Sequence, residues 1–485
     1  MKVVRLIAKK KNKEGIRISF VDEPASEDVT GSGVLVETPN HKILLDYGLA
    51  QSNDRYEDFL VNNRKTREFK AKDVDLVFLS HLHADHCLLC PKLFKDGCNG
   101  GVIISKGNLG VLKTMATDSA LISERDTLLI NTQHDKKYSP IYSLDDVNKM
   151  IEHTLEMNEN EKIYIDDEIS FKLIPSGHLL GGVQIVLYIT INDVTKVIGY
   201  TGDIGNREIN NYFVGKFQPI DCFCDILIGE STYGDRPDLK TGVKERKNDL
   251  DKLKSIIDTQ IKDMKGRVLI PSFAQSRVQQ LALMIYQLYK EEQWQPRVYI
   301  DSPLAISIFK DYEQILEGEE KELFDELLKW DRLVFVKESE DSKALVSSTE
   351  PCLVISTSGM CQVGRVRHHL KELIPNPNAT VLFVGFSSEG SLASLLRDNK
   401  TKSVTIDQKE YKCRCASYSL KSMSGHAPFR QLLSYYSSVP CNKIILHHGS
   451  TEAKETLAKD LKKELEKQCK TTRVVIANSS LKFGL

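Results

Sequence analysis

The chain has 485 residues, of which 41% are hydrophobic and 27% charged, so it is long enough for two or three domains with full hydrophobic cores. Its formal net charge is -1, so no global charge points to a polyanion partner, and local groups must attract any nucleic acid. No apolar run approaches membrane-spanning length, and residues 1–15 hold too short an apolar stretch for a secretory signal, which predicts a cytoplasmic protein without membrane association.

The chain begins with two predicted strands in residues 31–48 (GSGVLVETPNHKILLDYG), which are joined by a Pro-Asn-His turn. Asp46 stands at the end of the second strand. Residues 75–80 (DLVFLS) suit a buried strand, and the segment SHLHADHC, residues 80–87, continues from it directly. The sequence therefore places histidine and aspartate side chains together at the end of a buried strand.

The segment 80–87 predicts a metal site. Side chains two residues apart on an extended chain face the same side, so His81, His83 and Asp85 can converge, and His86 can join them from the following turn. Imidazole and carboxylate groups suit zinc, and the cluster holds more donors than one catalytic zinc uses, which favours two metals. The alternative is a solvated polar loop, but such ligands rarely gather at this spacing by accident.

The cysteines predict free thiols. There are eleven of them, an odd number in a chain without an export signal, which argues against a disulfide framework. Cys87, Cys90 and Cys98 follow the histidine segment, but no second CxxC or nearby histidine pair completes a set of four zinc ligands. We therefore expect these three cysteines to pack a helix.

Strands and helices continue to alternate, which favours a layered α/β architecture. Residues 100–105 predict another buried strand, whereas residues 131–168 are polar with few apolar anchors and predict an insertion or connection. Residues 169–178 predict a strand, and residues 184–203 predict a pair of strands hinged at Asn192 and Asp193.

After residues 224–234 the pattern changes to long amphipathic helices that alternate with strands, which predicts a self-contained α/β domain. The acidic run 317–326 predicts the solvated face of a helix. The last section returns to a strand, within 442–450, and a helix from Thr451. In the α/β domain we predict helices over 242–264 and 277–288 and strands over 267–272, 297–302, 351–358 and 379–387.

Three further candidate ligands lie where a predicted strand runs into a loop. His178 ends the first of these strands, Asp203 the second and His448 the third. Sheet scaffolds present catalytic groups at such positions. A single residue of this kind would more often be structural, but three at equivalent places favour one shared site.

These residues carry a family resemblance. HLHADH at 81–86, His178, Asp203 and Asp46 are similar to the successive motifs of the metallo-β-lactamase fold. ESTYGD around Glu230, SGHA around His426 and LHHG around His448 resemble the extra motifs of its β-CASP branch, which contains RNA-processing nucleases such as RNase J and the endonuclease of the cleavage and polyadenylation factor. The resemblance extends over nearly the whole chain.

The resemblance implies an α/β fold, a metallo-β-lactamase αββα sandwich with an inserted α/β β-CASP cap domain. The sandwich domain would be split in sequence between residues 1–236 and 400–485. The cap would take residues 237–399 and close over the sandwich domain to form a narrow substrate groove.

The resemblance also implies a centre with two zinc ions per chain. Asp203 would bridge the ions, and Asp46 would orient their ligands. Two-metal chemistry would activate water near neutral pH, His426 would protonate the leaving oxygen, and Glu230 would orient that histidine. The implied ligands are His81, His83 and His178 for one ion and Asp85, His86 and His448 for the other, with His447 as the adjacent alternative to His448.

Segments 271–277 and 355–360 look like family segments that line the groove. The stretch 384–394 (VGFSSEGSLAS) departs from the family by lacking its arginine, so other arginines must grip phosphate. The candidate RNA contacts are Arg277, Ser358, Arg365 and Ser387, with Arg367 as a further candidate.

The resulting hypothesis is a zinc-dependent ribonuclease that acts on single-stranded RNA and leaves 5′-phosphate and 3′-hydroxyl ends, with endonuclease and 5′ exonuclease action both open. A DNA nuclease of the same family is the nearest alternative, although members of that branch typically lack the histidine at position 448. A small-molecule hydrolase such as a thioesterase would not need Glu230 and His426. A catalytically silent scaffold would have lost ligands that are all present here. A homodimer and an RNA-processing complex are both left open as assemblies.

Overall fold

The computed structural model describes residues 15–21, 30–52, 54–64, 69–209, 211–385, 387, 390–399, 401–478 and 482–484. Residues 1–15, in which no secretory signal is predicted, lie outside the described residues apart from Gly15. The chain forms two compact units. The first comprises Met1–Arg207, Val214–Leu239 and His426–Leu485, and the second comprises Glu208–Phe213 and Lys240–Gly425.

The first unit contains two seven-stranded sheets. From one edge to the other, the strands of the first sheet are β22 (Lys482–Gly484), β1 (Arg17–Phe20), β2 (Gly33–Glu37), β3 (Lys42–Tyr47), β4 (Leu76–Phe78), β5 (Gly101–Ser105) and β6 (Thr154–Met157). The second has the order β21 (Arg473–Ile476), β20 (Cys441–Leu446), β11 (Cys224–Gly229), β10 (Val194–Tyr200), β9 (Val183–Ile191), β8 (Ile169–Pro175) and β7 (Lys162–Tyr164).

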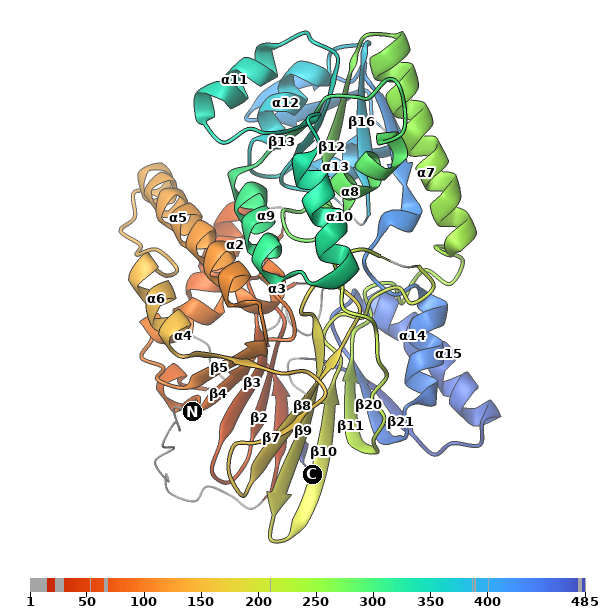
Figure 1. Ribbon diagram of the computed structural model, residues 1–485. Helices are drawn as coiled ribbons and strands as arrows, with labels where there is room; N and C mark the ends of the chain where they lie inside the picture. Colours follow the sequence, from red (N-terminus) through yellow and green to blue (C-terminus); the bar gives the residue numbers. More distant parts are fainter. Residues whose placement is uncertain are drawn as a thin grey trace. The chain divides into compact units, whose positions relative to one another are not determined.

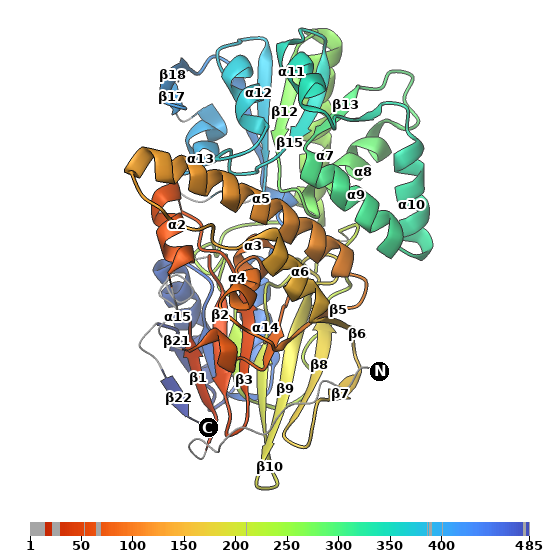
Figure 2. The same cartoon turned by 90° about the vertical axis from the view of Figure 1, so that its left-hand side faces the viewer.

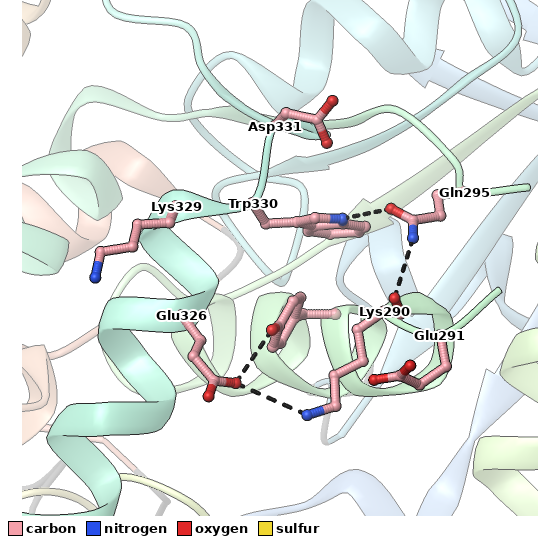
Figure 3. A pocket seen from close by; sticks show the side chains of 8 residues that line it. Lys290, Glu291, Gln295, Glu326, Lys329, Trp330 and Asp331 are labelled. Atoms are coloured by element: carbon pink, nitrogen blue, oxygen red, sulfur yellow. Dashed lines mark hydrogen bonds and ion pairs between the residues drawn. The ribbon is translucent and has the colours of Figure 1, made fainter. Parts of the chain in front are cut away.

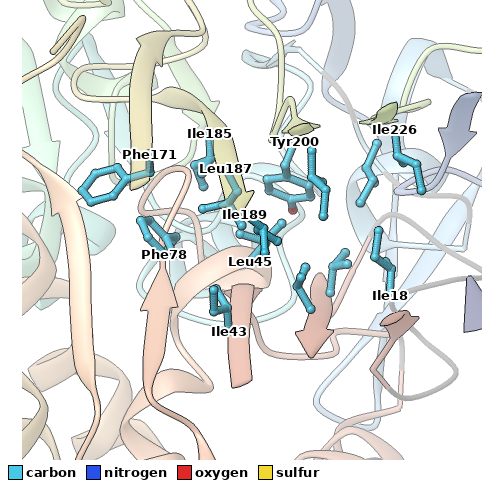
Figure 4. Close-up of a cluster of buried hydrophobic side chains, with 14 of the residues drawn as sticks. Ile18, Ile43, Leu45, Phe78, Phe171, Ile185, Leu187, Ile189, Tyr200 and Ile226 are labelled. Carbon is cyan, nitrogen blue, oxygen red and sulfur yellow. The ribbon is translucent and has the colours of Figure 1, made fainter. Parts of the chain in front are cut away.

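The two sheets share one apolar core (Figure 4). Strand alternation turns β-branched and aromatic side chains of both sheets inward. Phe78 of β4 and Phe171 of β8 meet edge to face with ring centroids 4.9 Å apart. Ile18, Leu45, Ile185 and other members of this core have no exposed surface, so the apolar runs of the sequence become the inner faces of the sandwich.

Helices cover both outer faces of the sandwich. α14 (Phe429–Ser438) and α15 (Thr451–Lys467) pack against β11 and β20 through a second apolar cluster that includes Leu432, Leu457 and Leu461. Figures 1 and 2 show further helices on the outer side of the first sheet. This is the predicted αββα arrangement. The helices on the side of the first sheet are α2 (Arg55–Asn63), α3 (Ala84–Cys87), α4 (Cys90–Lys95), α5 (Leu109–His134) and α6 (Leu144–Glu152).

The hinge predicted at Asn192 and Asp193 is confirmed as the turn between β9 and β10. Both residues have positive φ, 49° and 65°, as the central residues of a type I′ hairpin turn must have. This turn fixes the antiparallel register between β9 and β10, from Val194 opposite Ile191 to Tyr200 opposite Ile185.

Of the two possibilities predicted for residues 131–168, an insertion or a connection, the structure shows a connection. The segment contains the end of α5, then α6, β6 and β7, and it carries the chain from the edge of the first sheet to the edge of the second. The 26-residue helix α5 also had no sequence signal, because Ser123 and Thr127 are buried while Leu121 and Leu128 are 50% and 70% exposed. An apolar stripe therefore does not run along the whole length of the helix.

The second unit is built on a six-stranded parallel sheet, as the alternation of strands and helices predicted. The sheet order is β14 (Leu333–Phe335), β13 (Val298–Asp301), β15 (Cys352–Ser356), β12 (Arg267–Pro271), β16 (Ala379–Val384) and β19 (Ala416–Leu420), and β17 (Ser403–Ile406) and β18 (Lys409–Lys412) form a separate hairpin. Its helices are α7 (Val243–Ile257), α8 (Arg277–Tyr289), α9 (Pro303–Ile315), α10 (Gly318–Lys329), α11 (Ser339–Ser347), α12 (Val366–Leu373) and α13 (Leu392–Leu396).

Two details of the second unit differ from the sequence expectations. The helix predicted over 242–264 ends as an α-helix at Ile257 and continues as a π-helical turn over Asp258–Asp263. The boundary predicted at residue 400 differs from the division into units, which keeps Lys240–Gly425 together. The physical reason is that β19 pairs in parallel with β16 and so completes the sheet of the second unit. The acidic run 317–326 forms most of α10, in which Phe324 is buried and Glu322 and Glu326 are exposed.

No helix among the described ranges combines the length and the apolar character needed to cross a bilayer.

We predict that Leu461→Ala destabilises the first unit by about 2–5 kcal/mol, because it deletes a fully buried side chain between α15 and the second sheet. The measurement is the urea midpoint of unfolding, followed by circular dichroism. Lys462→Ala is the control, since its side chain is exposed on the same helix. Equal losses for the two variants would contradict the packing described here.

Candidate metal centre

The candidate ligands all belong to the first unit and all stand just beyond strand ends or in the short helix after one. His81 and His83 follow β4, and Asp85 and His86 lie in α3. The chain after β3 runs directly beneath α3, and Gly48 permits this approach, because a Cβ atom there would lie 1.8 Å from the carbonyl oxygen of Asp85. The remaining candidates follow β8 (His178), β10 (Asp203), β11 (Glu230) and β20 (His448) or precede α14 (His426).

One group of ligand atoms surrounds Oδ2 of Asp203. Nε2 of His81 and Nε2 of His178 each lie 3.6 Å from this oxygen. Nδ1 of His83 lies 3.3 Å from Nε2 of His178. These four residues offer one ligand atom each within 4.8 Å of one another, so the structure brings together the set predicted for the first ion.

A second group lies on the other side of the same carboxylate. Nε2 of His86 is 3.5 Å and Nδ1 of His448 is 3.1 Å from Oδ1 of Asp203. Nε2 of His448 is 3.1 Å from Nε2 of His86 and 3.5 Å from Oδ2 of Asp85. Asp203 therefore presents one oxygen to each group, which is the arrangement that a bridging ligand needs.

Asp46 contacts the second group through His86, on the ring edge away from Asp203. Its Oδ2 lies 2.7 Å from Nδ1 of His86 and accepts hydrogen bonds from the hydroxyls of Ser80 and Tyr200, each at 2.7 Å. The backbone amide of Ser80 donates to Oδ1 at 2.6 Å. Asp46 has a φ of 60°, a conformation that aspartate tolerates better than most residues. The network fixes the ring of His86 so that Nε2 faces the site.

Two members of this network could not be predicted from the sequence. Ser80 opens the histidine segment and Tyr200 closes β10, but neither residue type in a strand end indicates a partner for a distant aspartate. Only the packing of the two sheets against each other brings the Tyr200 hydroxyl to within 2.7 Å of Asp46.

The protonation states in the first group suit a metal. Burial holds the pKa of His81 and of His178 well below the ordinary value, and burial lowers the pKa of His83 to about 4. Burial opposes ionisation of Asp203, but the imidazoles of His448 and His86 outweigh it and hold its pKa well below the ordinary value. Neutral imidazoles and an ionised carboxylate are the forms that bind metal ions.

In the second group the two histidines have raised pKa values. Burial lowers the pKa of His86 and His448, but the carboxylates around them outweigh it and raise both pKa values, with Asp203 the largest of these influences. Burial also opposes ionisation of Asp85, but the hydrogen bond from His448 lowers its pKa to about 2. A cation at this position would replace protons on these imidazoles.

The residues fit a metal in both charge and donor type. Nε2 of His81 is buried and has no hydrogen-bond partner among the described residues, although it faces Asp203. Buried polar atoms without partners mark places where a ligand or ion belongs. Imidazole and carboxylate donors suit zinc, so the cluster can bind metal.

Glu230 and His426 lie beside the first group. The carboxylate of Glu230 is fully buried and accepts hydrogen bonds from the backbone amides of Ile204 and Thr232 at 2.9 Å and 3.0 Å. Nδ1 of His426 lies 3.9 Å from Glu230 and 3.8 Å from Oδ2 of Asp203. Burial lowers the pKa of His426, but the nearby carboxylates of Glu230 and Asp203 outweigh it and raise the pKa.

The adjacent histidines at the end of β20 point to opposite sides. The ring of His447 packs between those of Phe20 and Tyr200, with centroids 5.8 Å and 5.4 Å away, and faces the core. His448 has a φ of 49° and faces the ligand cluster. The structure thus places His448, the predicted choice, with the other candidate ligands.

The residues predicted to contact RNA all belong to the second unit. Ser358 follows β15, Arg277 begins the helix after β12, and Ser387 follows β16. These parallel strands are neighbours, so their carboxyl ends share one edge of the sheet. Arg365 is already engaged, because its guanidinium donates to the buried carboxylate of Asp301 at 2.8 Å and to backbone carbonyls. Arg367 likewise contacts Asp407.

The cysteine prediction agrees with the structure. Cys87, Cys90 and Cys98 are buried free thiols, of which the first ends α3, the second begins α4 and the third follows α4. Burial raises the pKa values of Cys87 and Cys90 well above the ordinary value. None of the candidate metal-binding groups found in the described part of the chain contains a cysteine.

A recess of about 620 Å³ in the second unit lies away from all of these residues (Figure 3). Its polar side chains are paired with one another. Tyr286 donates to Glu326 at 3.1 Å, and Trp330 donates from Nε1 to Gln295 at 2.7 Å. We assign it no part in the chemistry.

Three family models match the chain. The metallo-beta-lactamase superfamily matches residues 27–100, the Beta-Casp domain matches residues 278–396, and the Zn-dependent metallo-hydrolase RNA specificity domain matches residues 410–472. The first and last of these fall on the unit that carries the ligand cluster, apart from the beginning of the last.

Several curated proteins are similar over most of the chain. Ribonuclease TTHA0252 of Thermus thermophilus is 28% identical over 445 residues, which are 90% of this chain and 94% of that protein. Transcription termination factor FttA of Methanocaldococcus jannaschii is 27% identical, over 93% of this chain and 70% of that protein. An RNase J-like protein of the same organism is 29% identical, over 86% of this chain and 89% of that protein.

A solved structure of a protein of unknown function from Enterococcus faecalis V583 shares the fold. It matches with a TM-score of 0.50 and 12% identity, covering 97% of this chain and 100% of that chain.

We predict that Asp46→Asn weakens metal binding by roughly 10–100-fold, because the change removes the charge that orients and polarises His86. The measurement is metal content after dialysis against graded concentrations of a chelator. Asp166→Asn is the matched control, since Asp166 also pairs with a histidine, His41, at 2.7 Å but outside the cluster. Unchanged metal retention in Asp46→Asn would contradict the role given to this carboxylate.

Proposed function

We propose that this chain, which belongs to the β-CASP family of the metallo-β-lactamase superfamily, is a zinc-dependent ribonuclease that leaves 5′-phosphate and 3′-hydroxyl ends. Family membership makes it a metal-dependent hydrolase and an RNA-processing nuclease. The observation that carries the finer proposal is the position of His426 and Glu230 beside the ligand cluster, with Nδ1 of His426 3.8 Å from Asp203.

We assign the two halves of the catalytic domain to the first unit and the β-CASP domain to the second. All ligand candidates and the Glu230–His426 pair belong to the first unit. The Beta-Casp model falls within the second unit, as do Arg277, Ser358, Arg365 and Ser387. We keep these four residues as proposed RNA contacts, with Arg365 held in place by Asp301.

We propose that the cluster holds two zinc ions. His81, His83 and His178 would hold one, and Asp85, His86 and His448 would hold the other, with Asp203 shared between them. Bound zinc would supply positive charge to the scissile phosphate and would lower the pKa of a water molecule to near neutrality. Asp46 keeps His86 in the tautomer and orientation that leave Nε2 free for a ligand.

His426 is the proposed general acid. Since Glu230 and Asp203 favour its imidazolium form, it carries a proton that it can donate to the 3′-oxygen as the phosphorus–oxygen bond breaks. Glu230 itself is held by two backbone amides and has no exposed surface. It therefore positions the imidazole and is not expected to contact RNA.

RNA is proposed as the substrate because the comparisons and the site agree on it. Two of the similar proteins are named ribonuclease and RNase J-like, and one matching model is named for RNA specificity. His448, which is typically absent from the DNA-cleaving branch, is present and lies in the cluster. The cleavage rates of single-stranded RNA and DNA of the same sequence distinguish a ribonuclease from a DNA nuclease. Equal cleavage of both would favour the DNA alternative.

Similarity to proteins named transcription termination factor suggests a second role for the same chemistry, in which cleavage of a nascent transcript ends transcription. We also keep a homodimer and an RNA-processing complex as proposed assemblies. Light scattering of the purified chain separates the first of these from a monomer.

The mode of cleavage is tested with one RNA labelled at either end and prepared with a 5′ monophosphate or a 5′ triphosphate. Internal fragments that do not depend on the 5′ group indicate endonuclease action. Mononucleotides that require the monophosphate indicate 5′ exonuclease action. Absence of cleavage by a zinc-loaded chain would overturn the nuclease proposal.

We predict that the purified chain contains two zinc ions and that chelation abolishes RNA cleavage, because the water and the phosphate lose the charge that activates them. Zinc added back should restore activity. The measurements are elemental analysis and the labelled-RNA assay on the same sample. Undiminished cleavage by the metal-free chain would refute zinc dependence, and a ligand cluster that binds no zinc would favour a catalytically silent scaffold.

We predict that His426→Gln lowers kcat for RNA cleavage by about 10²–10⁴-fold while zinc content stays at the wild-type value, since the change removes the proton donor and none of the proposed ligands. Single-turnover cleavage and elemental analysis measure the two quantities. His368→Gln is the control, because His368 is an exposed histidine of the second unit. Loss of zinc in His426→Gln would instead assign this histidine to the metal.

A further inference from the structure

Thr232 contacts two different parts of the candidate centre, although it is not among the candidate ligands. It lies three residues after the end of β11 and is 6% exposed. Its backbone amide donates to Oε2 of Glu230 at 3.0 Å, and its hydroxyl oxygen lies 3.3 Å from Nδ1 of His448. Thr232 therefore joins the carboxylate that faces His426 to an imidazole of the second group.

The pairing of β11 with β20 brings Thr232 to His448. The two strands run in parallel and are paired up to Gly229, the last residue of β11. Beyond the sheet the amide of His447 donates to the carbonyl of Gly229 at 2.9 Å. The amide of Ser231 then donates to the carbonyl of His448 at 3.0 Å. Both segments belong to the first unit, so this contact is fixed within one compact unit.

Gly449 permits the two segments to lie this close together. A Cβ atom at this position would lie 2.7 Å from the carbonyl oxygen of Ser231, which is shorter than any ordinary van der Waals contact. A larger residue would therefore push the segment that carries Thr232 away from His448.

The hydroxyl of Thr232 faces the nitrogen of His448 that points away from the other histidine of its group. Nε2 of His448 lies 3.1 Å from Nε2 of His86 and 3.5 Å from Oδ2 of Asp85, whereas Nδ1 lies beside Thr232. A neutral imidazole carries one proton, so Nε2 can bind a cation only when that proton is on Nδ1. A hydrogen-bond acceptor beside Nδ1 keeps the proton there.

Asp203 is the other acceptor near Nδ1 of His448, with Oδ1 at 3.1 Å. This carboxylate is shared by both groups, so a bound cation would compete with the imidazole for its oxygen. A neutral threonine hydroxyl is not among the usual zinc ligands. The Thr232 oxygen would therefore stay available to Nδ1 of His448 when the second group is occupied.

We propose that Thr232 is a positioning residue for the second zinc ion: its hydroxyl accepts the Nδ1 proton of His448 and thereby directs Nε2 of that histidine toward the cation. This inference rests on the two-zinc centre proposed above. It adds a residue that is neither a ligand nor the general acid.

The expected effect of Thr232 on zinc affinity is moderate. Removal of a group that orients a metal ligand typically weakens metal binding by roughly 10–100-fold. Thr232 is neutral and lies 3.3 Å from His448, whereas the carboxylate of Asp46 lies 2.7 Å from His86. We therefore expect a loss of about tenfold, at the lower end of this range.

The test measures zinc binding by the full-length chain in competition with a chromophoric chelator, and it uses no RNA. Thr232→Val keeps the size of the side chain and the backbone amide but removes the hydroxyl. This variant should bind one of its two zinc ions about tenfold more weakly than the unmodified chain and the other ion equally well. Thr232→Ser restores the hydroxyl and should restore the lost affinity. Thr232→Ala should reproduce the loss.

Two comparisons separate positioning from a general loss of structure. Thr127→Val removes another buried hydroxyl of the first unit, which donates to the carbonyl of Ser123 at 2.7 Å, and it should leave both zinc affinities unchanged. Asp85→Ala removes a proposed ligand of the second ion. Adding Thr232→Val to Asp85→Ala should not alter the affinity for the zinc ion that remains.

Unchanged zinc binding by Thr232→Val would overturn the proposal, as would equal weakening of both ions. A Thr232→Ser variant that binds zinc as weakly as Thr232→Val would also overturn it. A chain that binds fewer than two zinc ions would overturn this inference together with the two-zinc centre. A chain that shows the expected zinc affinities but cleaves no RNA would support the role of Thr232 and overturn the nuclease proposal alone.

Discussion

The two-sided position of the Asp203 carboxylate is the constraint on which the whole candidate centre depends. Five imidazoles and the carboxylate of Asp85 are gathered around it. Each of its oxygens lies within 3.6 Å of histidine nitrogens from a different group. Buried charges are costly unless they are compensated. Asp203 supplies negative charge to both groups at once, and cations placed between these atoms would complete the compensation.

A layer of hydrogen bonds behind the cluster holds one of the histidines that faces Asp203. Asp46 binds His86, Ser80 and Tyr200 through short hydrogen bonds, and these partners come from both sheets of the sandwich. The position of the ligand His86 therefore depends on the packing of one sheet on the other. Glu230 plays a comparable part for His426, since two backbone amides fix the carboxylate that the imidazole faces.

Hydrogen bonds also distinguish the pKa values of the cysteines of this chain. Cys87 and Cys90 are buried, and burial is the largest influence that raises their pKa values. Cys222 is also partly buried, but the neighbouring thiol of Cys224 lowers its pKa to about 6, and the Tyr188 hydroxyl, which donates to its sulfur at 3.7 Å, lowers it further. Burial by itself makes a thiol inert, whereas burial beside donors favours the thiolate.

The sequence by itself determined the ligand types, their positions at strand ends and the alternation of strands and helices, because these follow from local spacing and from the apolar pattern of each segment. It missed α5, whose buried face carries Ser123 and Thr127, and the boundary that it predicts at residue 400 lies within the stretch Lys240–Gly425 that the contacts join in one compact unit. Whether His447 or His448 faces the cluster, and that Tyr200 supports Asp46, were decided by the tertiary structure. Such contacts join residues far apart in sequence, and their geometry exists only once the two sheets have packed.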